Sequence, residues 1–412
     1  MKVLVSCYAC SPYKGSEPGV GWNMAVALAK YHQVWVVTRK KNKNAIEDYL
    51  QKATIENLYF IYYDVPFLEK TIKRISDFLY YQCWNLLLTS RIREFVATHQ
   101  IDIVHHLTFN QYRTWSFGYY IDKPFVIGPI GGAEFIDSAF TKELGMKTSS
   151  QERWRKYKID VKIFGRLLCR NNQPKMVLFS AQEDQIRLRP VISDSVKTCV
   201  MPAIGIAPED FENISTNRQD DKPFTMVYAG RILDWKGLHT FLEAVVLVKN
   251  KLQDVRIELV GVNNTNDLKL ANSWLEKCGL HAITEIISWM PREQLLHHLA
   301  EIDLFVYPAF RDSGSMAVLE ACAIGCPAIC YDAGGQDAFP NDCVVKVPVI
   351  HDDYDKTLVN FSEKIVWAYQ NRNELQEYGK RAKEYVRNHL SWQNKAKIIS
   401  EYYEKLNQSK IK

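Results

Sequence analysis

Two basic positions in the second half of the chain have the residue types and spacing that bind a diphosphate. Arg231 and Lys236 lie in the segment Gly230 to Gly237, which follows a strand-like run at 225–229 and precedes an amphipathic helical pattern. A guanidinium and an ammonium placed so close together at the end of a strand can hold the oxygens of two linked phosphates. The alternative interpretation is a pair of solvated surface cations.

A pair of acids lies in a second loop of the same half. Asp312 comes just after a strand-like run, and Glu320 lies in a helical pattern that starts near Ser315. Along a helix the two carboxylates would be up to about 12 Å apart, which is too far for one paired acid and base. They can contact opposite ends of a long ligand, while backbone amides of Gly314, Ser315 and Met316 face its phosphates. Alternatively, Asp312 caps the helix and Glu320 is a solvated acid.

A glycine-containing turn near the start of the chain is a third candidate. Gly19 and Gly21 end the run Gly15 to Gly21, before a helical pattern at 22–30. Glycines let a backbone approach a phosphate closely. The run is not the dinucleotide fingerprint, since Met24 stands where its third glycine belongs, and it is not a Gly-Lys-Ser/Thr phosphate loop. We expect either ligand contact or a plain surface loop here, and the missing fingerprint argues against a dehydrogenase.

These loops stand at the ends of short apolar runs that alternate with helical patterns. Such runs occur at 3–5, 34–37, 59–63, 101–104, 125–127 and 177–179, and again at 226–228, 257–260, 285–287, 304–307 and 328–330. Alternation of this kind is typical of parallel sheets that are covered by helices on both faces. The pattern predicts two doubly wound, Rossmann-like α/β domains, whose ligands bind at the carboxyl ends of the strands.

The division between the two domains is predicted from length and composition. The chain of 412 residues is too long for one ordinary core. The stretch 202–223 collects prolines, Asn, Ser and Thr residues and a run of acids, which is the composition of a linker. We place the boundary near residue 206, which predicts domains at 1–205 and 206–392. A helical tail at about 393–412 follows them.

The overall composition is that of an ordinary globular protein, with 47% apolar and 24% charged residues. No run of about 18 apolar residues occurs, and the amino terminus lacks the apolar stretch of a signal peptide, so we expect a cytoplasmic protein. The ten cysteines are scattered, which favours free thiols over a disulfide framework. Cys7 and Cys10 have the spacing of a redox pair but lack a second pair for zinc.

Together these motifs resemble family 4 of the retaining glycosyltransferases, which have the two-domain GT-B fold. The family's Gly-Arg-hydrophobic-x-x-x-Lys-Gly motif stands at Gly230 to Gly237, and its Glu-x7-Glu motif stands at Asp312 to Glu320. The family pattern Glu-Ala-x-Ala-x-Gly-x-Pro follows at Glu320 to Pro327. The resemblance covers essentially the whole chain and is densest from Met226 to Gly335.

The resemblance implies a role for each residue of the second-half motifs. Arg231 and Lys236 would hold the diphosphate of a UDP-type or GDP-type sugar donor and stabilise the charge on the departing nucleotide. Glu320 would accept hydrogen bonds from the ribose hydroxyls. Ser315 and Met316 would offer backbone amides to the phosphates.

The resemblance also implies residues close to the transferred sugar. The acid there would be Asp312, where the family usually has a glutamate that is one methylene longer. The family has a histidine near the reacting sugar, in the region where this chain has His105 and His106. Adjacent residues of an extended chain point to opposite faces, so only one of the two can face the ligand, and we prefer His105. A core or capping histidine is the alternative.

The implied activity is that of a retaining hexosyltransferase that uses a nucleoside-diphosphate sugar, bound in a cleft between the domains. Its acceptor would be a glycan or a lipid-linked molecule, in the synthesis of cell-surface polysaccharide or glycoconjugate. The family needs no metal, because cationic side chains and helix dipoles replace it, and we expect no cofactor beyond the sugar nucleotide. The family also returns its C-terminal helix to the first domain. A sugar-nucleotide epimerase and a non-catalytic sensor of nucleotide sugars are the alternatives.

The net charge of +5 is unevenly distributed along the chain. Residues 1–205 contain 28 Lys and Arg against 18 Asp and Glu, a balance of +10, and the rest of the chain has 24 against 29, or −5. Helical patterns at 68–98 and 153–170 combine apolar, aromatic and basic residues. An anionic membrane surface or a lipid-diphosphate acceptor fits these segments, and two ordinary helices with solvated faces fit equally. We expect no nucleic acid partner.

Overall fold

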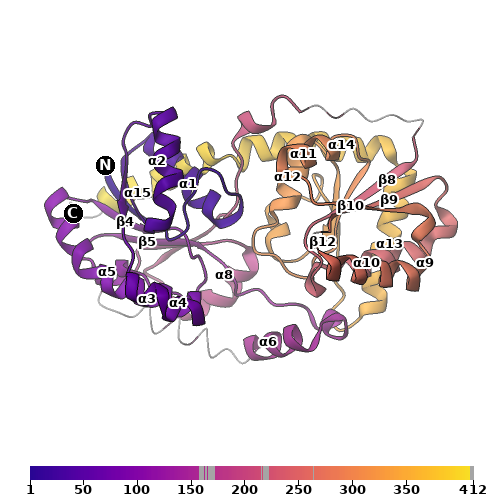
Figure 1. Cartoon of the computed structure of the whole chain (residues 1–412), viewed down its shortest axis with the longest axis horizontal. Helices are drawn as coiled ribbons and strands as arrows, with labels where there is room; N and C mark the ends of the chain where they lie inside the picture. The colour runs from indigo at the N-terminus through magenta and orange to yellow at the C-terminus, as the bar shows by residue number, and fades with distance from the viewer. Residues whose placement is uncertain are drawn as a thin grey trace. The chain divides into compact units, whose positions relative to one another are not determined.

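The computed structural model describes residues 1–156, 162, 165, 172–214, 216, 222–262 and 264–408. The chain divides into two compact units. Unit 1 comprises Met1–Ala133, Tyr157–Gly205 and Trp392–Lys412, and unit 2 comprises Glu134–Lys156 and Ile206–Ser391. Figure 1 labels helices and strands of both.

Unit 1 is built on a seven-stranded parallel sheet in the order β3-β2-β1-β4-β5-β6-β7. Its strands are β1 (Lys2–Ser6), β2 (Gln33–Thr38), β3 (Leu58–Tyr62), β4 (Ile103–His106), β5 (Phe125–Ile130), β6 (Met176–Phe179) and β7 (Lys197–Val200). The central strands β4, β5 and β6 are buried along their whole length. A sheet covered on both faces buries the side chains on both sides of each strand, which is why a strand such as β6 reads as a continuous hydrophobic run.

The helices of unit 1 include one from each end of the chain. They are α1 (Ser16–Ala29), α2 (Lys43–Lys52), α3 (Pro66–Lys70), α4 (Ile72–Ile75), α5 (Asp77–His99), α8 (Gln182–Leu188) and α15 (Trp392–Gln408). The C-terminal α15 packs on α1, near the amino end of the chain (Figure 1). Its buried Lys395 donates to the carbonyl oxygen of Ile204 at 2.6 Å and to that of Pro202. These bonds tie α15 into unit 1.

Unit 2 is built on a six-stranded parallel sheet in the order β10-β9-β8-β11-β12-β13. Its strands are β8 (Phe224–Ala229), β9 (Val255–Val262), β10 (Thr284–Ser288), β11 (Leu304–Tyr307), β12 (Ala328–Tyr331) and β13 (Val345–Val347). Its helices include α9 (Leu238–Val248), α10 (Thr265–Cys278), α11 (Arg292–Leu299), α12 (Met316–Ile324), α13 (Tyr354–Gln370) and α14 (Arg372–His389). The predicted fold class, two doubly wound α/β domains with parallel sheets, is confirmed.

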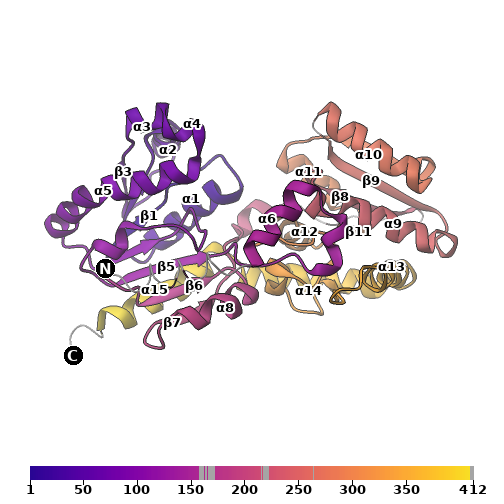
Figure 2. The ribbon, with the colours of Figure 1, turned by 90° about the horizontal axis from the view of Figure 1, so that it is seen from below.

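The segment Glu134–Lys156, here called the strap, corrects the predicted extent of the first domain. The prediction assigned all of 1–205 to that domain, whereas the strap belongs to unit 2 and contributes α6 (Met146–Lys156) to it (Figure 2). The ring of Phe140 stacks on Phe310 with centroids 4.1 Å apart, and Asp137 pairs with His351 at 2.9 Å. The strap's apolar side chains complete the core of unit 2, and a hydrophobic pattern alone does not say which core a segment joins.

Candidate functional site

Each sheet changes its winding direction between one pair of neighbouring strands, and ligands of open α/β sheets bind at the carboxyl ends of such a pair. In unit 2 this pair is β8 and β11, and in unit 1 it is β1 and β4. The segment 230–237 follows β8, and the loop with Asp312 follows β11. The architecture therefore brings the two predicted motifs to one edge of one sheet.

Three side chains meet at this edge of unit 2. The ammonium of Lys236 donates to Oδ2 of Asp312 at 2.6 Å and to the hydroxyl of Tyr307 at 2.6 Å. The hydroxyl of Tyr307 donates to the same oxygen of Asp312. The other carboxylate oxygen, Oδ1, accepts from the backbone amide of Gly314 at 3.2 Å. Lys236 and Asp312 are thus in direct contact, and Tyr307 is a third member that motif spacing did not identify.

The surroundings of Asp312 keep its carboxyl group ionised. Burial acts to raise the pKa of Asp312, but the charge and hydrogen bond of Lys236 and the bonds from Tyr307 and Gly314 together hold that pKa below its usual value. Burial and, second, the negative charge of Asp312 raise the pKa of Tyr307 well above its usual value. At neutral pH the tyrosine is therefore a protonated donor beside a carboxylate.

The two loops approach so closely that one position between them admits only glycine. Gly237 has a φ of 68°, and a Cβ there would lie 2.1 Å from the carbonyl oxygen of Pro308. Gly237 is also the residue that precedes α9. The last glycine of the motif is therefore explained by the close packing that sets Lys236 beside Asp312.

Arg231 differs from Lys236 because its side chain is exposed and forms no ion pair with a described residue. Its backbone is nevertheless fixed, since the buried hydroxyl of Tyr228 donates to the carbonyl oxygen of Arg231 at 2.9 Å. A cation on an anchored backbone, in the same loop as Lys236, suits a clamp on an anion.

The start of α12 can also receive an anion. The helix begins at Met316, next to the predicted start near Ser315. Ser315 adopts a left-handed conformation with a φ of 36°, and its side chain makes no capping hydrogen bond to the first turn. Its own buried hydroxyl has no hydrogen-bond partner among the described residues. The first backbone amides of the helix therefore remain available to a phosphate.

Glu320 lies inside α12, and its surroundings exclude the alternative of a solvated acid. Its side chain is 15% exposed, and Oε1 accepts from Nε of Arg292 at 2.5 Å. Arg292 also contacts Asp210 at 3.5 Å and lies over the ring of Phe211. A carboxylate that is oriented in this way by Arg292 can accept bonds from ligand hydroxyls. Sequence spacing could not find Arg292, because it comes from another helix.

The strap adds two nearly buried acids next to Asp312. Glu134 accepts from the hydroxyl of Ser313, and Glu152 accepts from Arg311 at 2.5 Å. The strap therefore bonds to Arg311 and Ser313, the residues that precede and follow Asp312. No sequence signal connects it with that loop, since the two are far apart in the chain.

The glycine turn of unit 1 differs from its prediction. Gly19 and Gly21 lie inside α1, which begins at Ser16, and not in a loop before residue 22. A Cβ on Gly21 would lie 2.2 Å from the carbonyl oxygen of Ala9, and one on Gly19 would lie 2.5 Å from that of Lys14. These glycines let the helix pack on the preceding loop. Steric packing explains why both positions are glycine, and ligand contact there stays a prediction.

His105 and His106 point to opposite sides of β4. Both are fully buried, and burial lowers the pKa of each to about 4. In His105, Nε2 contacts the carbonyl oxygen of Gly128 at 2.7 Å and Nδ1 contacts the hydroxyl of Tyr403. In His106, Nδ1 lies 3.3 Å from the hydroxyl of Tyr81, and Nε2 has no partner with hydrogen-bond geometry in the described part of the chain. The preference for His105 is therefore corrected, because the fold uses both of its nitrogens.

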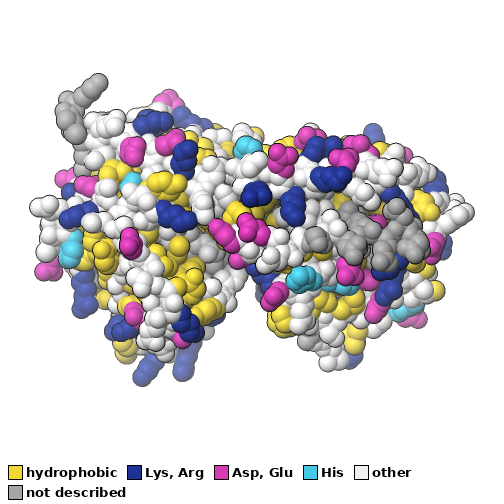
Figure 3. Space-filling model, turned by 90° about the horizontal axis from the view of Figure 1, so that it is seen from above, with side chains coloured by type: hydrophobic (Ala, Val, Ile, Leu, Met, Phe, Trp, Pro, Cys, Tyr) yellow, Lys and Arg dark blue, Asp and Glu magenta, His cyan; other side chains and the backbone are white. Residues whose placement is uncertain are grey.

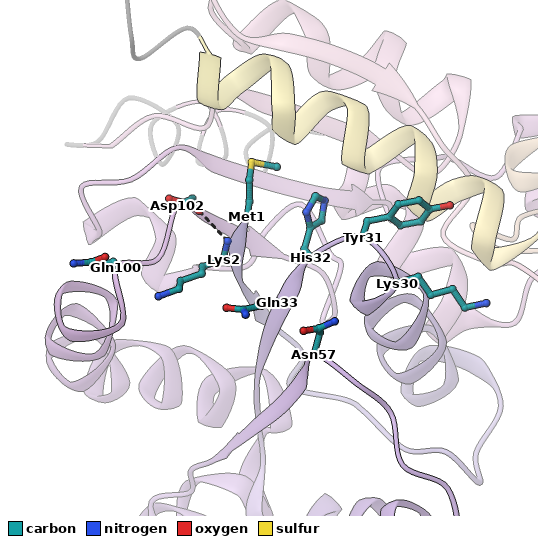
Figure 4. Close-up of a pocket in the computed structure, with 9 residues that line it drawn as sticks. All are labelled: Met1, Lys2, Lys30, Tyr31, His32, Gln33, Asn57, Gln100 and Asp102. Atoms are coloured by element: carbon teal, nitrogen blue, oxygen red, sulfur yellow. Dashed lines mark hydrogen bonds between the residues drawn. The ribbon is translucent and has the colours of Figure 1, made fainter.

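A polar pocket of about 490 Å³ lies at the opposite edge of the unit 1 sheet, where β1 and β2 begin (Figure 4). It is lined by Met1, Lys2, Lys30, Tyr31, His32, Gln33, Asn57, Gln100 and Asp102. Helices α1 and α5 end beside it, and the ammonium of Lys2 donates to the carbonyl oxygen of His99 at 3.1 Å. Helix ends carry partial negative charge, which the lysines here offset. The pocket therefore does not compete with the edge of unit 2 as a diphosphate site.

The predicted membrane-facing segment at 68–98 includes the last three residues of α3, all of α4 and all of α5 except His99. No helix in the described ranges is both long and apolar enough to cross a membrane. In and around this segment, Phe67, Ile75 and Leu79 are 75%, 83% and 52% exposed, and the basic residues Lys70, Lys73 and Arg74 lie between them in sequence. Figure 3 shows Lys and Arg side chains beside hydrophobic ones on one face of the molecule. The other predicted segment, 153–170, lies largely outside the described residues.

The cysteines and possible metal ligands offer no competing chemistry in the described residues. The thiols of Cys7 and Cys10 are free and buried, and burial raises the pKa of both, which makes them poor nucleophiles. No group of three or more His, Cys, Asp or Glu side chains within the described ranges is arranged to hold a metal ion.

A protein-family model matches most of the second unit. Residues 209–385 match the family model of the glycosyl transferases group 1. The matched range contains Arg231, Lys236, Asp312 and Glu320, which are the residues singled out by the geometry.

Two curated proteins are similar to parts of the chain. An uncharacterized glycosyltransferase of Methanocaldococcus jannaschii is 23% identical over 217 residues, which is 49% of this chain and 51% of that protein. An N,N'-diacetylbacillosaminyl-diphospho-undecaprenol alpha-1,3-N-acetylgalactosaminyltransferase of Campylobacter jejuni is 26% identical over 183 residues, or 41% of this chain and 44% of that protein. The chain thus spans about half the length of these relatives.

Solved structures match along nearly the whole chain. The HepE protein of Anabaena, in complex with UDP and glucose, superposes with a TM-score of 0.61 over 98% of this chain and 100% of that chain, at 14% identity. An identity this low shows the fold alone. The chain has the GT-B fold that its motifs predicted.

Proposed function

We propose that the chain, whose residues 209–385 match the glycosyl transferases group 1, is a retaining glycosyltransferase that uses a nucleoside-diphosphate sugar. The observation that carries the proposal is the cluster at the winding change of unit 2. There the cations Lys236 and Arg231 and the uncapped start of α12 are available to a diphosphate, next to the ionised Asp312. The presence of UDP in the HepE structure supports the choice of ligand.

The reaction breaks the bond between the anomeric carbon of the sugar and an oxygen of the outer phosphate. The bonding electrons remain on that oxygen, so the leaving diphosphate gains negative charge. Lys236 and Arg231 stabilise this charge more strongly in the transition state than in the ground state, which is the condition for catalysis.

Retention follows if the acceptor hydroxyl attacks from the face that the diphosphate leaves. The phosphate oxygen then takes the proton of the attacking hydroxyl, and a new bond forms on the same side of the anomeric carbon. Analysis of the product anomer tests this step. An inverted product would contradict it.

The acids have separate roles in this proposal. Asp312 accepts a hydrogen bond from a hydroxyl of the transferred sugar, because its carboxyl group is ionised. Glu320 accepts hydrogen bonds from the ribose, and Arg292 holds its side chain in the required orientation. The two contacts lie at opposite ends of one nucleotide sugar.

We further propose an acceptor in the synthesis of cell-surface polysaccharide or glycoconjugate, either a glycan or a lipid-linked molecule. The name of the Campylobacter relative, which includes a diphospho-undecaprenol, supports the lipid-linked class. The exposed Phe67, Ile75 and Leu79 with the neighbouring basic residues support peripheral contact with an anionic membrane. Sedimentation with vesicles tests this contact. Binding to vesicles with anionic lipid, weakened by Ile75→Asp, is expected.

The reaction is proposed to need no metal, because side chains and helix amides neutralise the diphosphate. Activity after dialysis against EDTA should equal the activity before it. A loss of activity that Mg²⁺ or Mn²⁺ restores would contradict this part of the proposal.

The experiment that tests the proposal as a whole is a screen of UDP-sugars and GDP-sugars for thermal stabilisation, followed by a turnover assay with the best ligand. A ligand at 100 times its Kd raises the free energy of unfolding by about 2.7 kcal/mol. Conversion of the donor sugar into an epimer, with no transfer, would favour an epimerase. Binding without any turnover would favour a sensor.

A further inference from the structure

The hydroxyl of Tyr307 lies between the two residues on which the proposed donor site depends. Tyr307 is the last residue of β11 and is 5% exposed. It accepts a hydrogen bond from Lys236 at 2.6 Å and donates one to Asp312. A phenol has one proton to donate, and burial keeps that proton in place, so its direction toward Asp312 is fixed.

Two anionic groups compete for the Lys236 ammonium, namely the Asp312 carboxylate and the diphosphate of a bound donor. In the structure the ammonium pairs with Asp312 at 2.6 Å. A diphosphate carries more negative charge than one carboxylate, so a bound donor draws Lys236 away from Asp312. The Asp312 side chain is only 24% exposed, so its carboxylate would lose much of its stabilisation with this cation unless other donors hold it.

Tyr307 meets this requirement. When Lys236 turns to the diphosphate, Asp312 keeps the Tyr307 hydroxyl on Oδ2 and the Gly314 amide on Oδ1. The position where Lys236 donated to Tyr307 then becomes free to accept a bond from a sugar hydroxyl.

We propose that Tyr307 is a positioning residue that holds Asp312 in place while the donor diphosphate engages Lys236. Asp312 is one methylene shorter than a glutamate, and the Tyr307 hydroxyl bonds directly to its carboxylate. This inference rests on the proposed function for its kinetic consequences, but its structural part can be tested without turnover.

The kinetic test compares Tyr307→Phe with Tyr331→Phe. Tyr331 is a fully buried tyrosine at the end of neighbouring β12, and its hydroxyl has no hydrogen-bond partner among the described residues, so it is a matched control. We expect Tyr307→Phe to lower kcat at least tenfold, to change UDP affinity less than threefold, and to move the acid limb of the pH profile to higher pH. The control should match the wild type. Unchanged kcat and an unchanged acid limb in Tyr307→Phe would overturn the proposal.

The test without turnover uses the pH dependence of unfolding. Asp312 has a lowered pKa, so its stabilising contribution is present above the unfolded pKa and is lost as pH falls through the folded one. Tyr307→Phe removes one hydrogen bond that lowers this pKa, so the loss should occur at higher pH than in the wild type. In the Asp312→Asn background the same substitution should shift nothing. An equal shift in both backgrounds would overturn the proposal even if the proposed transferase activity stands.

A rescue experiment gives an independent readout and needs no stable Tyr307→Phe single variant. The extra methylene of Asp312→Glu drives the carboxylate into the Tyr307 hydroxyl, so that variant should lose at least tenfold in kcat. Removing the hydroxyl in Tyr307→Phe/Asp312→Glu makes room and should recover at least part of the loss. Full activity of Asp312→Glu alone would contradict the proposed close fit of Tyr307 against Asp312. A double variant that is no more active than Asp312→Glu would contradict it as well.

Discussion

The carboxyl edges of the two sheets carry similar kinds of polar residues but use them differently. In unit 2, Lys236, Asp312 and Tyr307 bond to one another through side chains, and Arg231 stays exposed without an ion pair in the described chain. In unit 1, His105 is fully buried, and its partners are a backbone carbonyl and a tyrosine of α15. Side chains that bond mainly to each other can exchange partners with a ligand. Side chains that bond to the framework hold the fold.

The largest expected effect that tests this difference between the two edges is the loss of activity when Lys236 is replaced. Lys236→Ala removes the charge next to the leaving diphosphate, and kcat should fall by about 10² to 10³. Steady-state kinetics with the best donor measure the change. Lys346→Ala is the matched control, since Lys346 is also mostly buried and pairs with Asp332 at 3.1 Å in the same unit. A similar loss in both variants would point to general destabilisation.

A smaller effect is expected at Arg292, which acts through Glu320. Arg292→Ala removes the ion pair that orients Glu320, so KM for the donor should rise by roughly tenfold while kcat changes little. Donor saturation curves separate the two parameters. A change confined to kcat would contradict a role of Glu320 in binding the nucleotide.

In unit 1, replacing Tyr403 is expected to lower the stability of the fold and to leave nucleotide binding unchanged. Tyr403→Phe leaves Nδ1 of the buried His105 without its partner and should lower the free energy of unfolding by about 1 to 3 kcal/mol. UDP affinity should stay within a factor of two of the wild type. Urea unfolding and calorimetry measure the two quantities. Weaker UDP binding at unchanged stability would contradict the claim that these unit 1 side chains serve the fold and not the ligand.

A last expected effect is a pH dependence of stability from the buried His105 and His106. Burial lowers the pKa of His105 and His106 to about 4, below the value of about 6.5 in the unfolded chain. The unfolded chain binds more protons between these values, so stability should fall as pH decreases from about 6.5 to about 4. His106→Asn should flatten this part of the curve, whereas the exposed His281→Asn should not. Equal curves for all three proteins would contradict the burial of neutral histidines.

The comparison also shows which parts of the site a sequence can predict. Lys236 and Asp312 follow strands β8 and β11 directly, and neighbouring parallel strands end at the same edge, so spacing along the chain was enough to bring them together. Arg292, Glu134 and Glu152 come from other helices or from the strap. Their contacts depend on tertiary packing, for which no local pattern exists.

The differences between prediction and structure in unit 1 have a physical reason of the same kind. Glycines that approach a phosphate and glycines that approach a carbonyl oxygen have the same sequence signature, and Gly21 belongs to the second kind. The alternation of a strand correctly predicted that His105 and His106 face opposite sides. It could not predict that α15 covers the side of His105.

The most direct test of the proposed donor site is a calorimetric titration of UDP, and separately of GDP, into three proteins, namely the wild type, Lys236→Ala and Lys346→Ala. We expect the wild type to bind UDP, Lys236→Ala to bind it at least tenfold more weakly, and Lys346→Ala to bind it within a factor of two of the wild type. Equal affinity of the wild type and Lys236→Ala, or a wild type that binds neither UDP nor GDP, would contradict a nucleotide-sugar site at the carboxyl edge of the unit 2 sheet.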